Sequence, residues 1–304
     1  MIAFACAITD EEIYETCAAP GFRLAAEPDT ELVAHPSAGS IHRSYNMLLD
    51  RALDRFGPGG LESLVLVHQD AEIIDPDFIP KVREALQDPD VAIVGCAGAI
   101  DVRSIAWWEG SVTWASFTHR FDDHGGGEIP ALSWIPEKIP SFAETGTVDS
   151  LDGFVMAFSP WAIENLRFDE SIGTALHGYD FDICMQARQA GRKVVTAPLR
   201  VVHHHSLTLI SEKEGWIEAH IKLAEKWNGL VPDVGGDWRA RARRAEAELA
   251  VTRLQTGAGR LILEQRIGVL ERELEGVERS ISWRLTRPLR WLSKLFGRST
   301  VDPD

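Results

Sequence analysis

A short apolar run that stops at two carboxylates constrains the fold more than any other stretch of the sequence. Residues 64–67 are Leu-Val-Leu-Val, and Asp70 and Glu72 follow soon after. Such a run is typical of a strand buried on both faces, and ligands of parallel sheets bind beyond the carboxyl ends of their strands. In an extended chain, side chains two residues apart point the same way, so both carboxylates would lie on one side. That arrangement suits a divalent cation. The alternative interpretation is a solvated acidic turn.

Strand and helix patterns alternate along the first 227 residues. The predicted strands are residues 2–8, 31–34, 64–67, 91–94, 151–158, 193–197 and 200–203. The predicted helices are residues 11–18, 40–56, 77–86, 160–165, a helix that ends at 190, and 209–227. This alternation predicts an α/β fold with a mostly parallel, Rossmann-like sheet and flanking helices.

The pattern is interrupted between residues 95 and 149, where four tryptophans lie in an irregular stretch. They are Trp107, Trp108, Trp114 and Trp134. Long irregular insertions in compact domains are usually functional loops or lids, so these rings are candidates for stacking on sugars. A small satellite core is the alternative, and the sequence favours neither.

Charge is distributed unevenly along the chain. The formal net charge is −15, which argues against general affinity for nucleic acid. From Trp238 onward, fourteen Arg and Lys stand against nine Asp and Glu, so this part is about +5 and the preceding part about −20. The asymmetry predicts two parts with different partners.

The cysteines and the apolar runs indicate the cellular compartment of the protein. The four cysteines form no CxxC pair, and reduced thiols in the cytoplasm are the simplest interpretation. The N-terminus has no signal-like stretch, and no run of 18 apolar residues is present. We therefore expect a cytoplasmic protein without a membrane span.

The C-terminal part combines a heptad pattern with a basic segment. Apolar residues recur at 4-3-4-3-4 spacing: Leu263, Ile267, Leu270, Leu274, Val277 and Ile281. This pattern predicts a coiled coil and a homodimer, although the helix could instead pack on its own domain. The following segment has five basic residues, no acid up to Arg298 and several large apolar side chains. It is typical of a helix lying in an anionic membrane interface, here the inner face.

Three polar clusters end strands or begin helices at distant positions: Asp70 with Glu72, the segment 179–182, and His203 to His205. A doubly wound sheet can bring them to one edge. There a cation would neutralise a departing diphosphate, a carboxylate would remove a proton from a hydroxyl, and a histidine would complete the cation's coordination. We favour His203 as that histidine. A strand end facing solvent, or a core histidine, is the alternative.

These three segments resemble a known family. Val67-His-Gln-Asp-Ala-Glu72, together with residues 178–191 and Val202-His203, is similar to family 2 glycosyltransferases of the GT-A fold, over residues 1–227. The resemblance implies that Asp70 and Glu72 bind Mn²⁺ or Mg²⁺ and the donor diphosphate. It also implies that Asp180 is the catalytic base. Tyr179 departs from the glutamate that is common in the family.

The resemblance also implies a nucleotide-sugar site. Thr9, Asp10, Arg43 and Asn46 match positions that contact the nucleotide, and Asp152-Gly153 matches a wall of the sugar pocket. For Asp152-Gly153 a plain turn is the alternative, and Asp180 could simply cap its helix.

We therefore predict a cytoplasmic GT-A glycosyltransferase that is peripheral at the inner membrane face of a bacterium, of the surface-polysaccharide type. It would move a sugar from a nucleotide-sugar to a hydroxyl of a lipid-linked or polysaccharide acceptor, with inversion. The predicted parts are a catalytic domain (1–228), a linker (229–237), a helical segment (238–281) and a basic amphipathic tail (282–304). A silent GT-A-like scaffold that assembles partners through its helix is the alternative. A hydrolase built on the histidine triplet has weaker support, because no HExxH motif is present.

Overall fold

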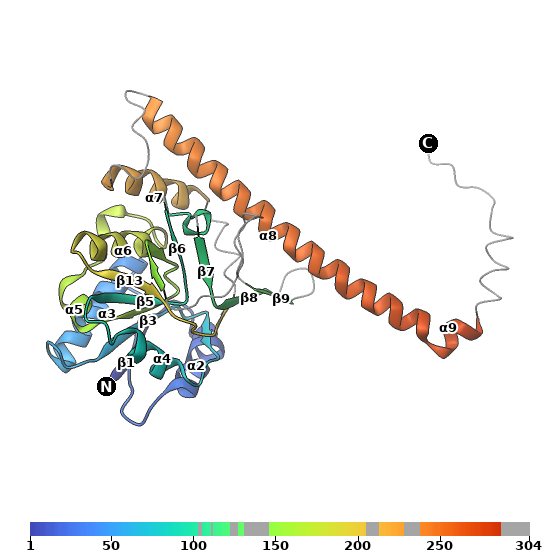
Figure 1. The fold of residues 1–304 in the computed structure, drawn as a ribbon, viewed down its shortest axis with the longest axis horizontal. Coiled ribbons are helices and arrows are strands. Elements are labelled where there is room, and N and C mark those ends of the chain that lie inside the picture. The colour runs from blue at the N-terminus through green and yellow to red at the C-terminus, as the bar shows by residue number, and fades with distance from the viewer. Residues whose placement is uncertain are drawn as a thin grey trace. The chain divides into compact units, whose positions relative to one another are not determined.

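The computed structural model describes residues 1–102, 105–110, 112–121, 127–130, 146–204, 213–227 and 238–286. The chain divides into two compact units, Met1–Gly257 and Ala258–Asp304, which are considered separately below. The division lies within the long helix of Figure 1, beyond the predicted linker 229–237, which is outside the described residues.

The strands are β1 (Ile2–Ile8), β2 (Glu31–Pro36), β3 (Ser63–Val67), β4 (Ala71–Ile73), β5 (Val91–Gly95), β6 (Ala97–Ile100), β7 (Val112–Ala115), β8 (Phe117–Phe121), β9 (Gly127–Pro130), β10 (Gly146–Val148), β11 (Ser150–Leu151), β12 (Val155–Phe158), β13 (Lys193–Thr196) and β14 (Val201–His204). The α-helices are α1 (Glu11–Ile13), α2 (Ala19–Ala25), α3 (Ile41–Phe56), α4 (Phe78–Ala85), α5 (Pro160–Asn165), α6 (Tyr179–Gln189), α7 (Lys213–Lys226), α8 (Trp238–Arg279) and α9 (Ile281–Leu285). A π-helical turn, η1 (Tyr14–Ala18), and two 3-10 turns, η2 (Trp107–Glu109) and η4 (Glu170–Ile172), complete the set of described helical elements.

A seven-stranded sheet is the centre of the first unit (Figure 1), with strand order β10-β13-β5-β12-β3-β1-β2. β1 pairs in parallel with β2 and β3, and β13 pairs in parallel with β5. Only β12 and β10 run against the other strands of this sheet. The predicted α/β class, with a mostly parallel sheet, is therefore confirmed.

The core lies on both faces of this sheet because side chains alternate along its strands. In β3, Val65 belongs to a cluster with Phe78 of α4, whereas Leu66 belongs to a second cluster with Tyr45 of α3. The whole of β3 is buried, as its apolar run predicted. Its polar continuation therefore emerges at a fixed place, the carboxyl end of the sheet.

The segment 151–158 was predicted as one strand, and that prediction is wrong. The chain leaves the three-stranded sheet β11-β6-β7 at Leu151 and enters the main sheet at Val155. Asp152 and Gly153 form the connection, and the Asp152 N–H donates to the Ala97 carbonyl. An apolar run does not show where a chain passes from one sheet to another.

The irregular stretch contains more regular structure than its sequence indicated. It holds β6, β7, β8 and β9, which belong to the two smaller sheets, and β10 of the main sheet. Trp107 is buried, packs edge-to-face on Trp108 and donates from Nε1 to Asp152 Oδ2 at 3.2 Å. For Trp107 the small-core interpretation therefore holds. Trp134 lies outside the described residues, and the structure does not describe the Trp114 side chain.

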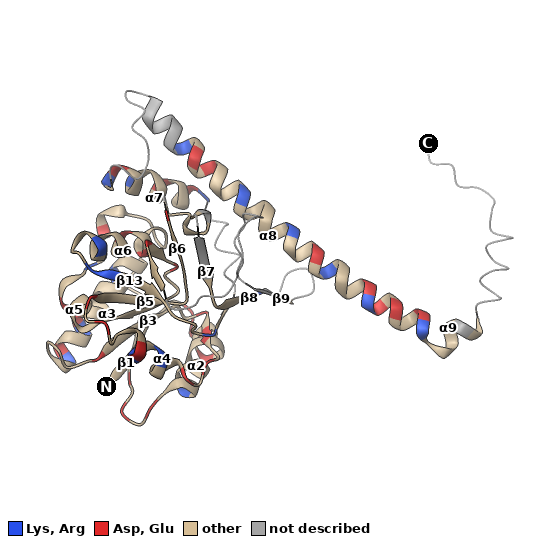
Figure 2. Ribbon diagram, in the orientation of Figure 1, with Lys and Arg blue, Asp and Glu red and all other residues tan. Residues whose placement is uncertain are grey.

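The long helix α8 begins in the first unit and continues through the second. In the first unit Ala247, Ala250 and Val251 are buried. In the second unit the six heptad residues are 46–77% exposed, and Lys or Arg and Asp or Glu alternate along the helix (Figure 2). Pairing of two chains through this stripe stays a prediction. No helix within the described ranges is both long and apolar enough to cross a bilayer.

A buried ion pair connects α7 to α6. The fully buried carboxylate of Asp182 accepts from Lys226 Nζ at 2.8 Å, from Trp227 Nε1 at 2.8 Å and from Gln186 Nε2 at 2.8 Å. Asp182 is thus a structural acid at the start of α6. Removing one partner of a buried charge is costly because the other partner stays desolvated.

We predict that Lys226→Met lowers the free energy of unfolding by about 1–3 kcal/mol. Urea denaturation followed by circular dichroism measures this difference. The matched control is Lys193→Met, because Lys193 pairs with the exposed Asp88 at 2.7 Å and should contribute below about 1 kcal/mol. Equal losses in the two variants would show that burial of Asp182 has no energetic consequence.

Candidate active site

Pairing between β4 and β14 brings two distant segments together just beyond the end of β3. After β3 the chain turns at Gln69–Asp70, and the His204 N–H donates to the Asp70 carbonyl at 2.8 Å. β4 then runs antiparallel to β14, with Ala71 opposite His203. The His68 N–H donates to the Phe154 carbonyl at 2.9 Å, which fixes the end of β3 against the start of β12.

This arrangement gathers His68, Asp70 and His203 into one cluster. One ligand atom from each lies within 4.8 Å of the others. Asp70 Oδ1 is 3.5 Å from His203 Nε2 and 3.8 Å from His68 Nδ1. His203 is buried and stacks on Phe154, and its Nε2 has no hydrogen-bond partner within the described part of the chain.

The protonation states of His68 and Asp70 suit a metal. Burial lowers the pKa of His68 to about 4, so its imidazole is neutral at pH 7. Burial opposes ionisation of Asp70, but the neighbouring His203 and His68 hold its pKa below the ordinary value. Neutral imidazoles and an ionised carboxylate are the forms that coordinate divalent cations, and mixed nitrogen and oxygen ligands favour transition ions over Mg²⁺. The buried, unpartnered Nε2 of His203 is the observation that fits such an ion best.

Glu72 lies apart from this cluster. Its carboxylate accepts from Arg120 Nη1 at 3.2 Å and lies 2.9 Å from His204 Nε2. Asp70 sits in the turn before β4 and Glu72 inside the strand, so the chain is not extended between them as the spacing argument assumed. His68, which the sequence argument did not single out, joins Asp70 instead. His205 lies outside the described residues.

Asp180 begins a second group of polar side chains, in the first turn of α6. Its Oδ2 accepts from the Gly153 N–H at 3.1 Å and its Oδ1 from the Phe181 N–H at 2.8 Å. Burial, followed by the charge of Asp152, raises the pKa of Asp180 to about 7. Burial likewise raises the pKa of Asp152. A carboxylate with a pKa near 7 is suited to take up a proton at neutral pH.

A cavity of about 320 Å³ adjoins the cluster of His68, Asp70 and His203. It lies at the carboxyl ends of β1, β2 and β3, and its lining residues are Ala7, Thr9, Ser37, Gly39, Ser40, Ile41, Tyr45, His68, Gln69, Asp70, Ala175 and Leu176. Gln69 closes one side, because its Oε1 accepts from the Thr9 and Asp10 N–H groups at 2.7 and 3.0 Å. The sequence argument missed the Ser-Ala-Gly-Ser loop that follows β2. The sequence feature that could have identified this loop is a run of small and polar residues between a predicted strand and a predicted helix.

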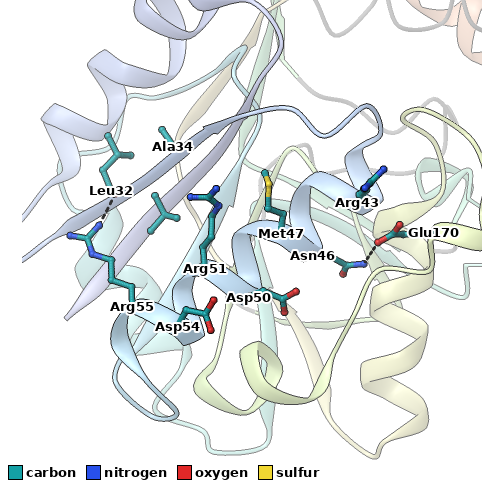
Figure 3. A pocket seen from close by; sticks show the side chains of 11 residues that line it. Leu32, Ala34, Arg43, Asn46, Met47, Asp50, Arg51, Asp54, Arg55 and Glu170 are labelled. Atoms are coloured by element: carbon teal, nitrogen blue, oxygen red, sulfur yellow. Dashed lines mark hydrogen bonds between the residues drawn. The ribbon is translucent and has the colours of Figure 1, made fainter.

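The four residues expected at the nucleotide occupy different places. Thr9 lines the cavity, while Asp10 caps α1 by accepting from the Glu12 N–H at 2.9 Å. Arg43 and Asn46 line a separate open groove of about 830 Å³ between β2 and α3 (Figure 3). Asn46 also exchanges two hydrogen bonds with the Phe168 backbone, at 2.8 and 2.9 Å, which gives it a structural role.

The raised pKa of Asp180 predicts a pH-dependent difference in stability. Folding favours the protonated form, so stability falls as the pH rises from about 4 to about 7, and the loss persists above that range. We predict that Asp180→Asn is more stable than the wild type at pH 8 by about 2–4 kcal/mol, and that the difference vanishes near pH 4.

Asp169→Asn provides a control of opposite sign. Burial opposes ionisation of Asp169, but the hydrogen bond from Lys226 and further bonds lower its pKa to about 2. Its ionised form therefore stabilises the fold at neutral pH, and the asparagine variant should be less stable there. Thermal unfolding of both variants from pH 4 to pH 8 measures the two trends. Destabilisation by Asp180→Asn at pH 8 would contradict the assignment.

Comparisons with known proteins identify the family of this chain. The sequence profile described as "Glycosyltransferase like family" matches residues 3–224. The streptomycin biosynthesis protein StrF of Streptomyces griseus is 23% identical over 210 residues, which cover 68% of this chain and 67% of StrF.

Two solved structures are similar at a greater distance. Mannosyltransferase PcManGT from Pyrobaculum calidifontis, solved with GDP-Man and Mn²⁺, has 14% identity and a TM-score of 0.45 over 98% of this chain and 87% of its own. GalNAc-T7, solved with UDP, GalNAc and Mn²⁺, has 12% identity and a TM-score of 0.47 over 82% of this chain and 54% of its own. The profile match covers well over half of the sequence, and the chain therefore belongs to this glycosyltransferase-like family.

Proposed function

We propose that this enzyme transfers a sugar from a nucleotide-sugar donor to a hydroxyl of a lipid-linked or polysaccharide acceptor, in a metal-dependent reaction. The observation that carries the proposal is that His68 and Asp70 belong both to the three-residue metal-binding cluster and to the wall of the cavity. A cation held there would lie beside any diphosphate in the cavity. We propose that the enzyme acts in bacterial surface-polysaccharide synthesis.

The chain's residues divide the chemistry between them. His68, Asp70 and His203 would hold a divalent cation, Mn²⁺ rather than Mg²⁺, and when bound it supplies positive charge to a departing diphosphate. Thr9 and the loop after β2 offer hydroxyls and backbone groups to the nucleotide. Asp152 and Gly153 stand beside Asp180 and would form the wall that faces the sugar.

Asp180 would take the proton from the attacking acceptor hydroxyl. Its pKa near 7 keeps a large fraction ionised at neutral pH while leaving it basic enough to accept a proton. Asp180 acting as the base for a direct attack of the acceptor hydroxyl on the donor sugar would invert the anomeric carbon. The rate should rise with pH through about 7 as Asp180 ionises.

We predict that Asp180→Asn lowers turnover of a nucleotide-sugar by about 10²–10⁴-fold while donor binding is kept. The assay follows nucleoside diphosphate release from UDP-, GDP- and dTDP-sugars with Mn²⁺ and lipid-linked glycan acceptors. Asp182→Asn is the matched control, because Asp182 is fully buried and bound to Lys226 and Trp227. If Asp182→Asn is the damaging change and Asp180→Asn is benign, the base is misassigned. If the wild type binds the donor but does not turn it over, the alternative of a catalytically silent scaffold is favoured.

The C-terminal part supports a proposal about the partners. In the heptad, positions a hold Ile267, Leu274 and Ile281, and positions d hold Leu263, Leu270 and Val277, so one stripe of the helix is apolar throughout. Their exposure leaves the stripe accessible to a second copy of the chain. Two basic tails on one dimer would raise the affinity for an anionic membrane without new contacts, and would hold the enzyme at the inner face near a lipid-linked acceptor.

We predict reversible, salt-sensitive binding of the whole chain to anionic vesicles. Five cations contribute on the order of 1 kcal/mol each near such a surface, and salt screens that attraction. Co-sedimentation with phosphatidylglycerol vesicles compares the whole chain with a form that ends at Ser280. The shorter form ends at Ser280 and not at the linker, because α8 residues up to Val251 are buried in the first unit. Removing them would disturb the fold as well as remove the tail. Equal binding by the two forms, or none at low salt, would refute the role of the tail.

A further inference from the structure

Tyr179 occupies the position next to Asp180 where the family resemblance leads one to expect glutamate. Its ring is buried at the start of α6 and packs against the rings of Tyr45 and Phe168, with ring centroids 5.7 and 6.0 Å away. Its hydroxyl lies 2.6 Å from His68 Nε2. The residue before the proposed base therefore contacts a proposed metal ligand.

This contact reaches the ring nitrogen of His68 that faces away from the cluster. Nδ1 is the nitrogen directed at Asp70, 3.8 Å from its Oδ1, and Nε2 faces Tyr179. A neutral imidazole carries one proton, so Nδ1 offers a lone pair to a cation only when Nε2 holds that proton. Metal-binding histidines generally donate the other N–H to a partner that fixes the tautomer and the ring orientation.

The geometry points to Tyr179 as a positioning residue for the metal site, an inference that rests on the proposed metal-dependent function. Its hydroxyl oxygen accepts the proton of His68 Nε2, which holds Nδ1 ready to coordinate the cation. Tyr179 touches neither the donor nor the cation in this account, and it acts only through His68. A glutamate at the same position would place a charge there instead of a neutral hydroxyl.

The neighbouring glycine shows how closely Tyr179 is held. A Cβ added to Gly153 would lie 2.4 Å from the Tyr179 hydroxyl oxygen and 2.5 Å from the ring, so only glycine leaves room for this ring. The Gly153 N–H also donates to Asp180 Oδ2. One glycine therefore contacts both Tyr179 and Asp180. The residue that contacts the proposed metal ligand is thus adjacent, in one helical turn, to the proposed base.

The test is the affinity for Mn²⁺ alone, measured by electron paramagnetic resonance of the free ion. Tyr179→Phe keeps the ring and removes only the hydroxyl. Loss of such an outer partner typically weakens metal binding 10- to 100-fold, and we expect a decrease in this range. Tyr14→Phe is the matched control, because Tyr14 is a buried ring that packs on Phe22; we expect its metal affinity to equal that of the wild type.

A double-mutant cycle separates positioning from a general structural effect. If Tyr179 acts through His68, then adding Tyr179→Phe to His68→Ala should weaken Mn²⁺ binding no further. Additive losses would overturn the inference. A ¹⁵N-histidine NMR spectrum of the wild type loaded with Zn²⁺ gives a readout that needs no tyrosine variant. The His68 signal, assigned by its loss in His68→Ala, should show the proton on Nε2, and a proton on Nδ1 would overturn the inference.

The outcomes also distinguish this inference from the function on which it rests. If the wild type takes up no Mn²⁺, both the metal-dependent function and the role of Tyr179 fail. If His68→Ala weakens binding and Tyr179→Phe does not, only the role of Tyr179 fails. If His68→Ala itself binds Mn²⁺ like the wild type, His68 is not a ligand and the inference fails, while Asp70 and His203 could still hold the ion.

Discussion

The pairing of β4 with β14 is the interaction on which the candidate site depends. Three backbone pairs and the bond from the His204 N–H to the Asp70 carbonyl hold a strand that follows β3 against the last strand of the catalytic unit. Asp70 and His203 are more than 130 residues apart in the sequence, and this pairing alone brings them to 3.5 Å. Because backbone bonds set the register, a slip of one residue would turn His203 away from Asp70.

Burial gives neighbouring groups the protonation states that the chemistry needs. The same desolvation that lowers the pKa of His68 to about 4 raises that of Asp180 to about 7, because in each case it disfavours the charged form. In the proposed mechanism His68 would thereby be a neutral ligand, and Asp180 would be a base that changes state near neutral pH. Asp182, two residues further along α6, instead accepts from Lys226 and Trp227 and connects α6 to α7. Two aspartates in one helical turn thus have different roles.

The sequence allowed the sheet and part of the site to be predicted, because both depend on local patterns. The apolar run of β3 and the carboxylate after it placed Asp70 at a strand end. The sequence predicted only that a sheet can bring the His203 segment to the same edge, and the pairing of β14 with β4 does so. Glu72 could not be placed, since its direction depends on a turn at Gln69–Asp70 that the spacing did not reveal. His68 was missed because one histidine beside an acidic pair carries no signal of its own. Arg43 and Asn46 line a different groove from the cavity beside Asp70, and their contact with the nucleotide stays a prediction (Figure 3).

The central claim is that Asp70, with two histidines, holds a cation beside the donor cavity, and that Glu72 does not. Calorimetric titration with UDP, GDP and dTDP, with and without Mn²⁺, compares the wild type with Asp70→Asn and Glu72→Gln. The account predicts that Mn²⁺ strengthens binding of at least one nucleotide, that Asp70→Asn abolishes this gain, and that Glu72→Gln keeps it. A gain that survives Asp70→Asn but is lost in Glu72→Gln, or no gain in the wild type with any of the three nucleotides, would contradict it.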